Sequence, residues 1–160
     1  MADLITLATY KDAEGLSTPK EDGRIGALIP SVSQLVKTYC GNSFVDFYSS
    51  NKTETFNIDW GTHIVQLTES PVNALVSVQE RSSYSDSYTT LTTGAYEYSL
   101  DSNTDSIMRT WSSGGYKNWP MGVDAVKIVY TAGYSAVPAD LNLAVIDLVT
   151  YYLKDEHKER

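Results

Sequence analysis

The clearest pattern in the chain is an apolar stripe at helical spacing between residues 19 and 40. Spacings of three and four residues place the members of the stripe on one face of a helix: Ile25, Leu28, Ile29, Val32, Leu35, Val36 and Tyr39. Thr18 and Glu21 match a capping box, with Pro19 at the first helical position, where its missing N–H group loses no hydrogen bond. Gly41 is well suited to end the helix. We therefore predict a helix over residues 19–40.

The N-terminal region is predicted to contain a second, shorter helix. Thr6 is a suitable N-cap and Gly15 a suitable left-handed C-terminal residue, which predicts a helix over residues 6–14. Pro30 lies inside the longer helix, where its ring clashes with the carbonyl of Gly26 and removes one hydrogen bond. The longer helix is therefore expected to be kinked or split at this position.

Between residues 44 and 132 the apolar period changes from helical to two, which predicts a large antiparallel β region. Phe56, Ile58 and Trp60 alternate with polar residues before Gly61–Thr62, and an apolar run over 63–67 follows. This pattern predicts a hairpin. Further strands are expected at 74–80, 88–92, 95–100, 106–111 and 125–131. The Ser- and Tyr-rich run at 81–88 is expected to be an exposed, mobile loop.

A final helix is predicted over residues 138–157. Pro138 suits its first position, and Asp140 lies near the positive end of the helix dipole. Two faces of this helix are apolar, one with Leu141, Ala144, Val145, Leu148 and Tyr152 and the other with Leu143, Ile146, Val149 and Leu153. Two interpretations fit this width: a core helix surrounded by its own domain, or a helix packed partly against neighbouring subunits. The fold class expected from these elements is α+β.

Length and charge restrict the possible functions. The 160 residues suit a single domain covering 1–160. A net charge of -8 disfavours gripping of nucleic acid through a basic patch. Residues 41–100 hold seven acids and only two bases, Lys52 and Arg81. Two interpretations fit this acidic segment: an ordinary solvated surface, or a channel wall past which DNA slides without binding. The N-terminus does not resemble a signal peptide, and no apolar run is long enough to span a membrane.

Candidate catalytic groups are few. His63 falls at a predicted turn and His157 in a charged tail, while the single cysteine, Cys40, ends the apolar stripe and is expected to be a small buried or half-buried residue. The two histidines and one cysteine are too few for a zinc site, and no glycine pattern matches a phosphate- or dinucleotide-binding loop. We therefore expect no enzyme, no metal and no cofactor.

Several segments resemble the tailed-bacteriophage head-to-tail connector family, also called adaptor or head-completion proteins. The chain opens with DLITLATYKDAEG, and the next helix ends in the turn Tyr39-Cys40-Gly41-Asn42-Ser43-Phe44. The middle segment VQLTESPVNALVSVQ is similar to the family's strand, proline turn and strand. The closing segment VKIVYTAGYSAVPADLNLAVIDLVTYYL carries the most specific similarity. Residues 81–124 resemble the family only loosely.

The resemblance implies a structural protein with no turnover, located in the virion neck. The family's fold is a small helical bundle with a β-rich insertion. Its members form rings, commonly dodecameric, between the portal and a stopper or tail-completion protein, and DNA passes through without specific binding. The end of the last helix would approach the portal or a neighbouring subunit, through Leu148, Tyr151, Tyr152, Leu153 and Lys154. Asp59 and Glu69 are the acids expected to face the DNA channel.

Three alternatives remain at this point. The first is a neck or completion protein on the tail side. The second is a β-rich ligand-binding module, since Trp60, Trp111, Trp119 and the twelve tyrosines offer surfaces for stacking. The third, an enzyme, rests only on the abundance of acidic residues. Binding to free heads or free tails would separate the first alternative from the connector.

Overall fold

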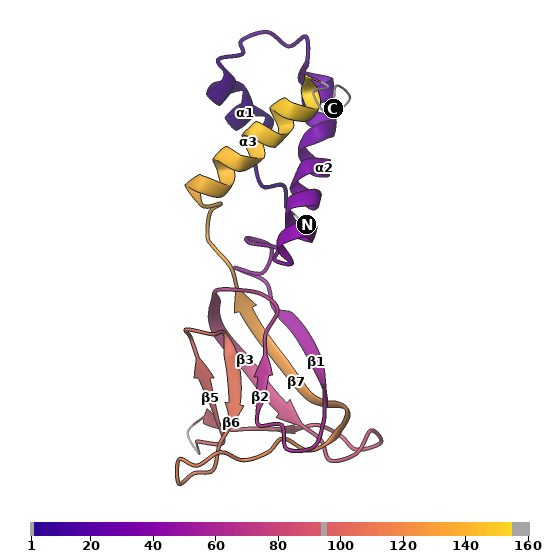
Figure 1. Cartoon of the computed structure of the whole chain (residues 1–160), viewed down its shortest axis with the longest axis vertical. Helices are drawn as coiled ribbons and strands as arrows, with labels where there is room; N and C mark the ends of the chain where they lie inside the picture. Colours follow the sequence, from indigo (N-terminus) through magenta and orange to yellow (C-terminus); the bar gives the residue numbers. More distant parts are fainter. Residues whose placement is uncertain (1, 94–95, 155–160) are drawn as a thin grey trace. The chain divides into compact units, whose positions relative to one another are not determined.

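A computed structural model describes residues 2–93 and 96–154 (Figure 1). The chain forms two compact units: Met1–Asp46 with Tyr134–Arg160, and Phe47–Gly133. Within the described residues, the first unit holds three helices and the second holds two antiparallel sheets, which confirms the predicted α+β class with a β insertion between helices. That residues 1–160 act as a single connector domain stays a prediction.

The helical unit consists of α1 (Leu7–Glu14), α2 (Asp22–Cys40) and α3 (Ala139–Leu153). Its core forms where one face of α2 meets α3, and the buried side chains include Ile25, Ile29, Val32 and Val36 from α2 and Val145, Ile146 and Val149 from α3. α1 joins this core through Tyr10, whose hydroxyl lies 2.8 Å from the Thr150 hydroxyl of α3. The predicted caps of α1 are confirmed, with Thr6 accepting from the Thr9 N–H and Gly15 in the left-handed conformation.

The start predicted for α2 is wrong. The helix begins at Asp22 rather than at Pro19, and no side chain caps its N-terminus. Residues 19–22 form a separate turn, closed by a hydrogen bond from the Asp22 N–H to the Pro19 carbonyl, and Asp22 is ion-paired with Lys11 of α1 at 2.8 Å. The first residue of α2 is therefore the one that is ion-paired with α1, and the capping sequence at Thr18–Glu21 does not set the start of the helix. The end at Gly41 is confirmed.

Pro30 does not split α2, which runs unbroken from Asp22 to Cys40. Pro30 and Gly26 both lie on the exposed face, so the Gly26 carbonyl left without its helical donor can bond to water. The predicted stripe is also narrower than expected, because Tyr39 is 91% exposed and Leu35 is largely exposed. Cys40 is exposed as well, so the prediction of a buried or half-buried cysteine is wrong.

Two polar residues of α2, Ser33 and Lys37, are buried, whereas the apolar residues Leu35 and Tyr39 are exposed. The Ser33 hydroxyl accepts a hydrogen bond from the Leu4 N–H. Lys37 donates to the Ala2 carbonyl at 2.7 Å and to Asp46 at 2.8 Å. These bonds attach the N-terminal segment and Asp46 to α2.

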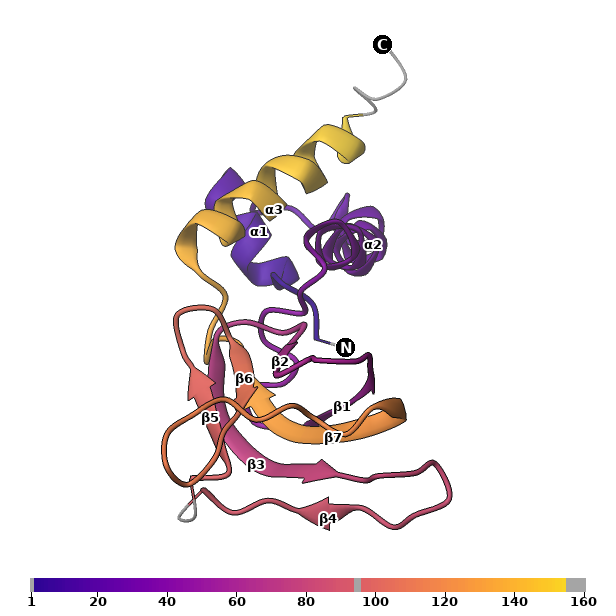
Figure 2. The ribbon, with the colours of Figure 1, turned by 60° about the horizontal axis from the view of Figure 1, so that its bottom comes forward.

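The β unit contains, among its described residues, a four-stranded and a three-stranded sheet, both antiparallel (Figure 2). The larger sheet has the order β1 (Lys52–Ile58), β7 (Gly122–Ala132), β3 (Val72–Glu80) and β4 (Thr89–Thr90). The smaller has the order β2 (Ile64–Gln66), β6 (Ser106–Arg109) and β5 (Tyr98–Asp101). Every strand predicted beyond the hairpin therefore exists, with shifted ends.

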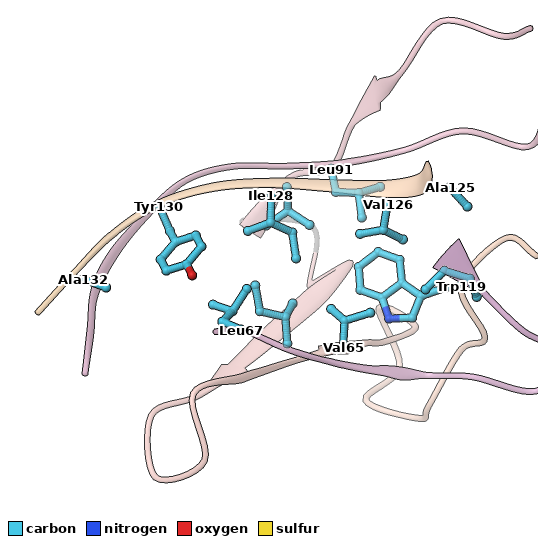
Figure 3. Close-up of a cluster of buried hydrophobic side chains, with 12 residues drawn as sticks. Val65, Leu67, Leu91, Trp119, Ala125, Val126, Ile128, Tyr130 and Ala132 are labelled. Carbon is cyan, nitrogen blue, oxygen red and sulfur yellow. The ribbon is translucent and has the colours of Figure 1, made fainter. Parts of the chain in front are cut away.

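The core of the β unit lies between the two sheets. Figure 3 shows Val126, Ile128 and Tyr130 of β7 pointing toward Val65 and Leu67. Side chains on β7 alternate between this core and the outer face, as the period of two requires.

The predicted hairpin over residues 56–67 is wrong. β1 pairs with β7, and β2 pairs with β6 in the other sheet. The turn at Gly61–Thr62 therefore carries the chain from one sheet to the other, so that Ile58 and Val65 meet in the core from opposite sides. Trp60, expected on the alternating face, is 88% exposed.

The ends of the other elements lie close to those predicted. α3 begins at Ala139 with Pro138 as its N-cap, and its last helical residue is Leu153. The remainder of the predicted helix, from residue 155 on, lies outside the described residues, as does His157. The loop at 81–88 is largely exposed, as predicted, although Arg81 and Tyr88 are half-buried.

Loss of the Asp46 carboxylate should destabilise the helical unit. Lys37 and Asp46 are both largely buried, so Asp46→Asn leaves a buried ammonium without its counter-charge, and we expect the free energy of unfolding to fall by about 3 kcal/mol. Burial acts to raise the pKa of Asp46, but hydrogen bonds from Lys37 and the Ala2 N–H, with the Lys37 charge, lower it below its ordinary value of 3.8.

Because the folded pKa is lowered, the carboxylate contributes full stability above pH 3.8 and loses this contribution as the pH falls below that value. Urea unfolding across this range should show the difference between wild type and Asp46→Asn shrinking toward acid. Asp12→Asn, at an exposed position of α1, is the matched control and should change little. A difference that persists unchanged in acid would contradict the assignment.

Candidate interaction surfaces

The end of α3, predicted to contact a partner, is only partly exposed. Leu148, Tyr152 and Leu153 pack against the helical core. The ring of Tyr151 meets that of Tyr152 edge to face, with centroids 5.4 Å apart. Lys154 is exposed. Lys154 is thus the fully exposed member of the predicted set, and the other four are half-buried; that these residues contact a partner stays a prediction.

A more exposed face of α3 was not among the predicted contact residues. Asp140, Leu143, Ala144 and Asp147 follow one another at helical spacing on one side of α3 and are all exposed. Leu143 is 61% exposed, and Ala144 beside it is also exposed. The signal was present in the sequence, because Leu143 belongs to the second apolar face of this helix.

Two apolar hollows adjoin this helix. One, of about 250 Å³, is lined by Leu28, Ser31, Val32, Leu35 and Tyr152. The other, of about 390 Å³, lies at the start of α3 beside Phe44, Tyr134, Pro138 and Leu141 and includes the exposed Cys40. The helical unit therefore presents apolar surface on more than one side, as an interaction protein requires.

The two acids predicted to face a channel have different environments. Asp59 is exposed, in the turn after β1. Glu69 is only 6% exposed and is ion-paired with Lys52 at 3.0 Å. In the chain by itself, the charge of Glu69 is thus compensated internally, and of these two acids it is Asp59 that presents its carboxylate to solvent.

Glu69 belongs to a buried polar cluster at one end of the β core. Lys52 also contacts Glu54, which accepts from the Tyr130 hydroxyl at 3.0 Å and from the Thr68 hydroxyl. Burial acts to lower the pKa of Lys52, but hydrogen bonds to Glu69 and Glu54 outweigh burial and raise it. Burial, together with the negative charge of Glu54, raises the pKa of Tyr130 well above its ordinary value. The cluster is therefore a structural network of ion pairs and hydrogen bonds.

The aromatic residues divide between the core and the surface. Trp119 is buried in the β core, whereas Trp60 and Trp111 are exposed. Trp111 lines an open hollow of about 420 Å³ with Tyr96, Tyr98 and the turn 112–114. Of the three tryptophans proposed as stacking surfaces, two are therefore accessible.

Other predicted features concern chemistry and membranes. His63 lies beside β2, with its ring 4.8 Å from that of Tyr116. Among residues 2–93 and 96–154, no group of three His, Cys, Asp or Glu side chains is placed to hold a metal ion. Within the same residues, no helix has both the length and the apolar character needed to cross a membrane.

Comparison with known families gives a match over nearly the whole chain. The family model described as "HCP: Head completion protein" matches residues 3–160. The chain belongs to the head completion protein family. The resemblance found in the terminal segments is thereby confirmed. No curated protein sequence matches the chain.

Three solved structures of gene transfer agent (GTA) particles contain a chain with a similar fold. A chain in "Neck of empty GTA particle computed with C6 symmetry" is similar with a TM-score of 0.64 and 19% identity, over 93% of this chain and 77% of that one. A chain in "Neck of native GTA particle computed with C12 symmetry" gives a TM-score of 0.60 and 16% identity, over 96% and 82% of the two chains. One in "Virion of native gene transfer agent (GTA) particle" gives 0.64 and 17%, over 93% and 78%. At these identities the likeness establishes a shared fold.

The two predicted channel acids should respond differently to charge reversal. Glu69→Lys places a second ammonium beside buried Lys52, and we expect a loss of about 3 kcal/mol or more in the free energy of unfolding. Asp59→Lys changes an exposed turn and should stay within about 0.5 kcal/mol of wild type. Thermal and urea unfolding measure both. A Glu69→Lys chain as stable as wild type would contradict the buried ion pair.

Proposed function

We propose that this protein is a structural subunit of the neck that joins a DNA-filled head to its tail, with no enzymatic turnover. The observation that carries the proposal is the head completion family match over residues 3–160. The fold likeness to chains of gene transfer agent necks supports it, because it extends over 93% or more of the chain.

In this role the subunits form a ring. The neck structures with a similar chain are described with C6 and C12 symmetry, which supports a dodecamer. A closed ring requires two different surfaces on each subunit, since every contact joins one face of a chain to another face of the next. The exposed leucines and the two hollows of the helical unit supply apolar surface for contacts of this kind.

The portal is the partner proposed for α3. Leu143 and Ala144 form an exposed apolar centre, flanked by Asp140 and Asp147 along the same face. An apolar centre with a charged rim is the usual composition of a protein interface. Tyr151 and Lys154 extend this surface toward the end of the helix, where contact with the portal was predicted. A stopper or tail-completion protein would bind the opposite side of the ring.

DNA is proposed to pass through the ring without being bound. With a net charge of -8, the chain has no excess of cations to neutralise phosphates, so DNA meets a repulsive rather than an adhesive surface. A channel of this charge lets the duplex move in both packaging and ejection.

A nonsense mutation in the gene for this chain tests the function directly. Electron microscopy of the resulting particles should show detached tails beside tail-less heads, some of which leak DNA, because the joint is missing. Purified protein added to the extract should restore joining. Intact tailed particles without this protein would overturn the proposal.

The contact surface on α3 has its own test. Leu143→Asp replaces an exposed apolar side chain with a charge, so the fold should persist while incorporation into particles falls at least about tenfold, because a desolvated carboxylate disfavours the interface. Leu16→Asp is the matched control, at an exposed leucine outside α3. Quantitative immunoblotting of purified particles measures incorporation, and equal incorporation of both variants would remove α3 as the contact.

A further inference from the structure

An open hollow beside β5 and β6 of the smaller sheet gathers aromatic rings and hydroxyl groups. It has a volume of about 420 Å³ and is lined by Tyr96, Tyr98, Ser99, Thr110, Trp111 and the turn 112–114. Six of its eight lining residues, all Tyr, Ser or Thr, carry a hydroxyl group, and none is charged or purely aliphatic. Tyr96 is 70% exposed and Trp111 53% exposed, so both rings are open to solvent. We call this site the tyrosine–tryptophan hollow.

The pairing of β5 with β6 holds Tyr96 at the hollow. Tyr98 lies opposite Arg109, so the residues before Tyr98 run alongside those after Arg109, at one end of the neighbouring strands β5 and β6 in Figure 1. The Thr110 N–H donates to the Glu97 carbonyl at 3.0 Å, and the Thr110 hydroxyl donates to the Tyr96 carbonyl at 2.6 Å. Tyr96 has a φ of 55°, which is uncommon for a residue other than glycine. Hydrogen bonds from β6 thus keep an exposed ring in a fixed place.

A tight turn and a lysine hold Trp111. Its N–H donates to the Gly115 carbonyl at 2.7 Å, and its carbonyl accepts from the Gly114 N–H at 2.8 Å. The Lys117 ammonium lies 4.7 Å from the centroid of the indole ring. Lys117 lines an adjoining hollow of about 250 Å³ and not this one, so it contacts the indole from outside the tyrosine–tryptophan hollow. The indole is therefore held in place before a ligand arrives, which lowers the entropic cost of binding.

This lining matches the surface of a pyranose sugar. One face of a sugar ring is a patch of C–H groups that packs on an aromatic ring, and its edge carries hydroxyl groups that donate and accept hydrogen bonds. Most small-molecule sites, of about 300–1,000 Å³, have apolar walls with only a few polar groups. Exposed rings surrounded by hydroxyl groups instead suit a ligand that is itself apolar on one face and covered with hydroxyl groups at its edge.

We propose that the tyrosine–tryptophan hollow binds a neutral glycan, with Trp111 and Tyr96 as its stacking surfaces. A neutral sugar is favoured over an acidic one because no residue of the lining supplies a cation. The hollow is open to solvent, which lets a longer glycan chain continue beyond it on either side. This binding activity goes beyond the neck function proposed above and does not depend on it.

Other ligands that stack on aromatic rings fit the hollow less well. Single-stranded nucleic acid stacks its bases on Tyr and Trp but also needs a positively charged groove along its backbone. The lining of the hollow holds no cation, and the chain has a net charge of -8. A protein partner would use the same aromatic residues around a desolvated apolar centre, which a lining of hydroxyl groups interrupts.

Titration of the purified full chain with neutral oligosaccharides tests the site. The probes are short oligosaccharides of glucose, galactose, mannose and N-acetylglucosamine, screened on an array and then measured by isothermal titration calorimetry. At least one should bind with a Kd of about 1 mM or lower. Trp111→Ala should weaken this binding by about tenfold or more, because it removes the largest stacking surface of the hollow. Trp111→Phe keeps an aromatic ring and should lose less affinity.

The other tryptophans supply the controls. Trp60→Ala removes a side chain that is 88% exposed and lies outside the hollow, so it should bind as wild type does. Binding should also change the tryptophan fluorescence. Because Trp119 is buried in the β core, this change should persist in Trp60→Phe and disappear in Trp111→Phe. Circular dichroism and thermal unfolding verify that each variant is folded.

Four results would overturn the site: no oligosaccharide binds at millimolar concentration, Trp111→Ala binds as tightly as wild type, Trp60→Ala loses as much affinity as Trp111→Ala, or single-stranded DNA binds in place of the oligosaccharides. Particles that carry Trp111→Ala should keep their tails. Tail-less heads from a folded Trp111→Ala chain would make the hollow a protein contact and would also overturn the proposal. The neck function is tested separately, on particles from the nonsense mutant, so the failure of one proposal leaves the other standing.

Discussion

The pairing of β7 with both β1 and β3 is the constraint on which the β unit depends. β7 is the longest strand of the two sheets and lies inside the larger one, and Val126, Ile128, Tyr130 and Ala132 turn almost completely buried side chains toward the smaller sheet. The end of β7 also bonds to the start of the β unit and to the segment before β3: the Ala132 N–H donates to the Phe47 carbonyl and the Gly133 N–H to the Pro71 carbonyl. Both ends of the insertion are therefore held by the sheet.

Three cations of this acidic chain form ion pairs in its interior. Lys37, Lys52 and Arg109 are paired with internal carboxylates, and Arg109 joins the two sheets by gripping Glu80 with two nitrogens at 2.9 Å. Each of these cations takes at least one carboxylate with it, so the acidic surplus of the chain comes from its composition and lies on the residues outside the pairs. In the proposed neck role an acidic exterior is an advantage, since it offers few phosphate contacts to DNA.

The two units contribute differently to the proposed ring. The helical unit has an ordinary apolar core but also exposed leucines on α2 and α3, which the described part of the chain does not cover. The β unit holds its polar and aromatic groups in fixed positions, in part through the hydrogen bonds around Asp124. The helical unit therefore offers exposed apolar surface for contacts between subunits of the proposed ring, whereas the hydrogen bonds around Asp124 act within the β unit.

Local sequence signals were sufficient to predict the α+β class, the helices, most of the strands and the family, whereas strand pairing and the burial of polar groups emerged only in the folded chain. The apolar period of α2, the left-handed glycines at 15 and 41 and the closing segment around α3 are all short-range signals, because a segment's own residues record which face it buries.

β1 and β2 were predicted to form one hairpin but belong to different sheets, because a period of two gives the buried face of a strand and not its partner. Glu69 and Lys37 are buried since a counter-charge arrives from another segment of the chain, and Trp60 is exposed since its turn crosses between sheets. Pairing and burial of charge depend on contacts between separate segments, which no local pattern records.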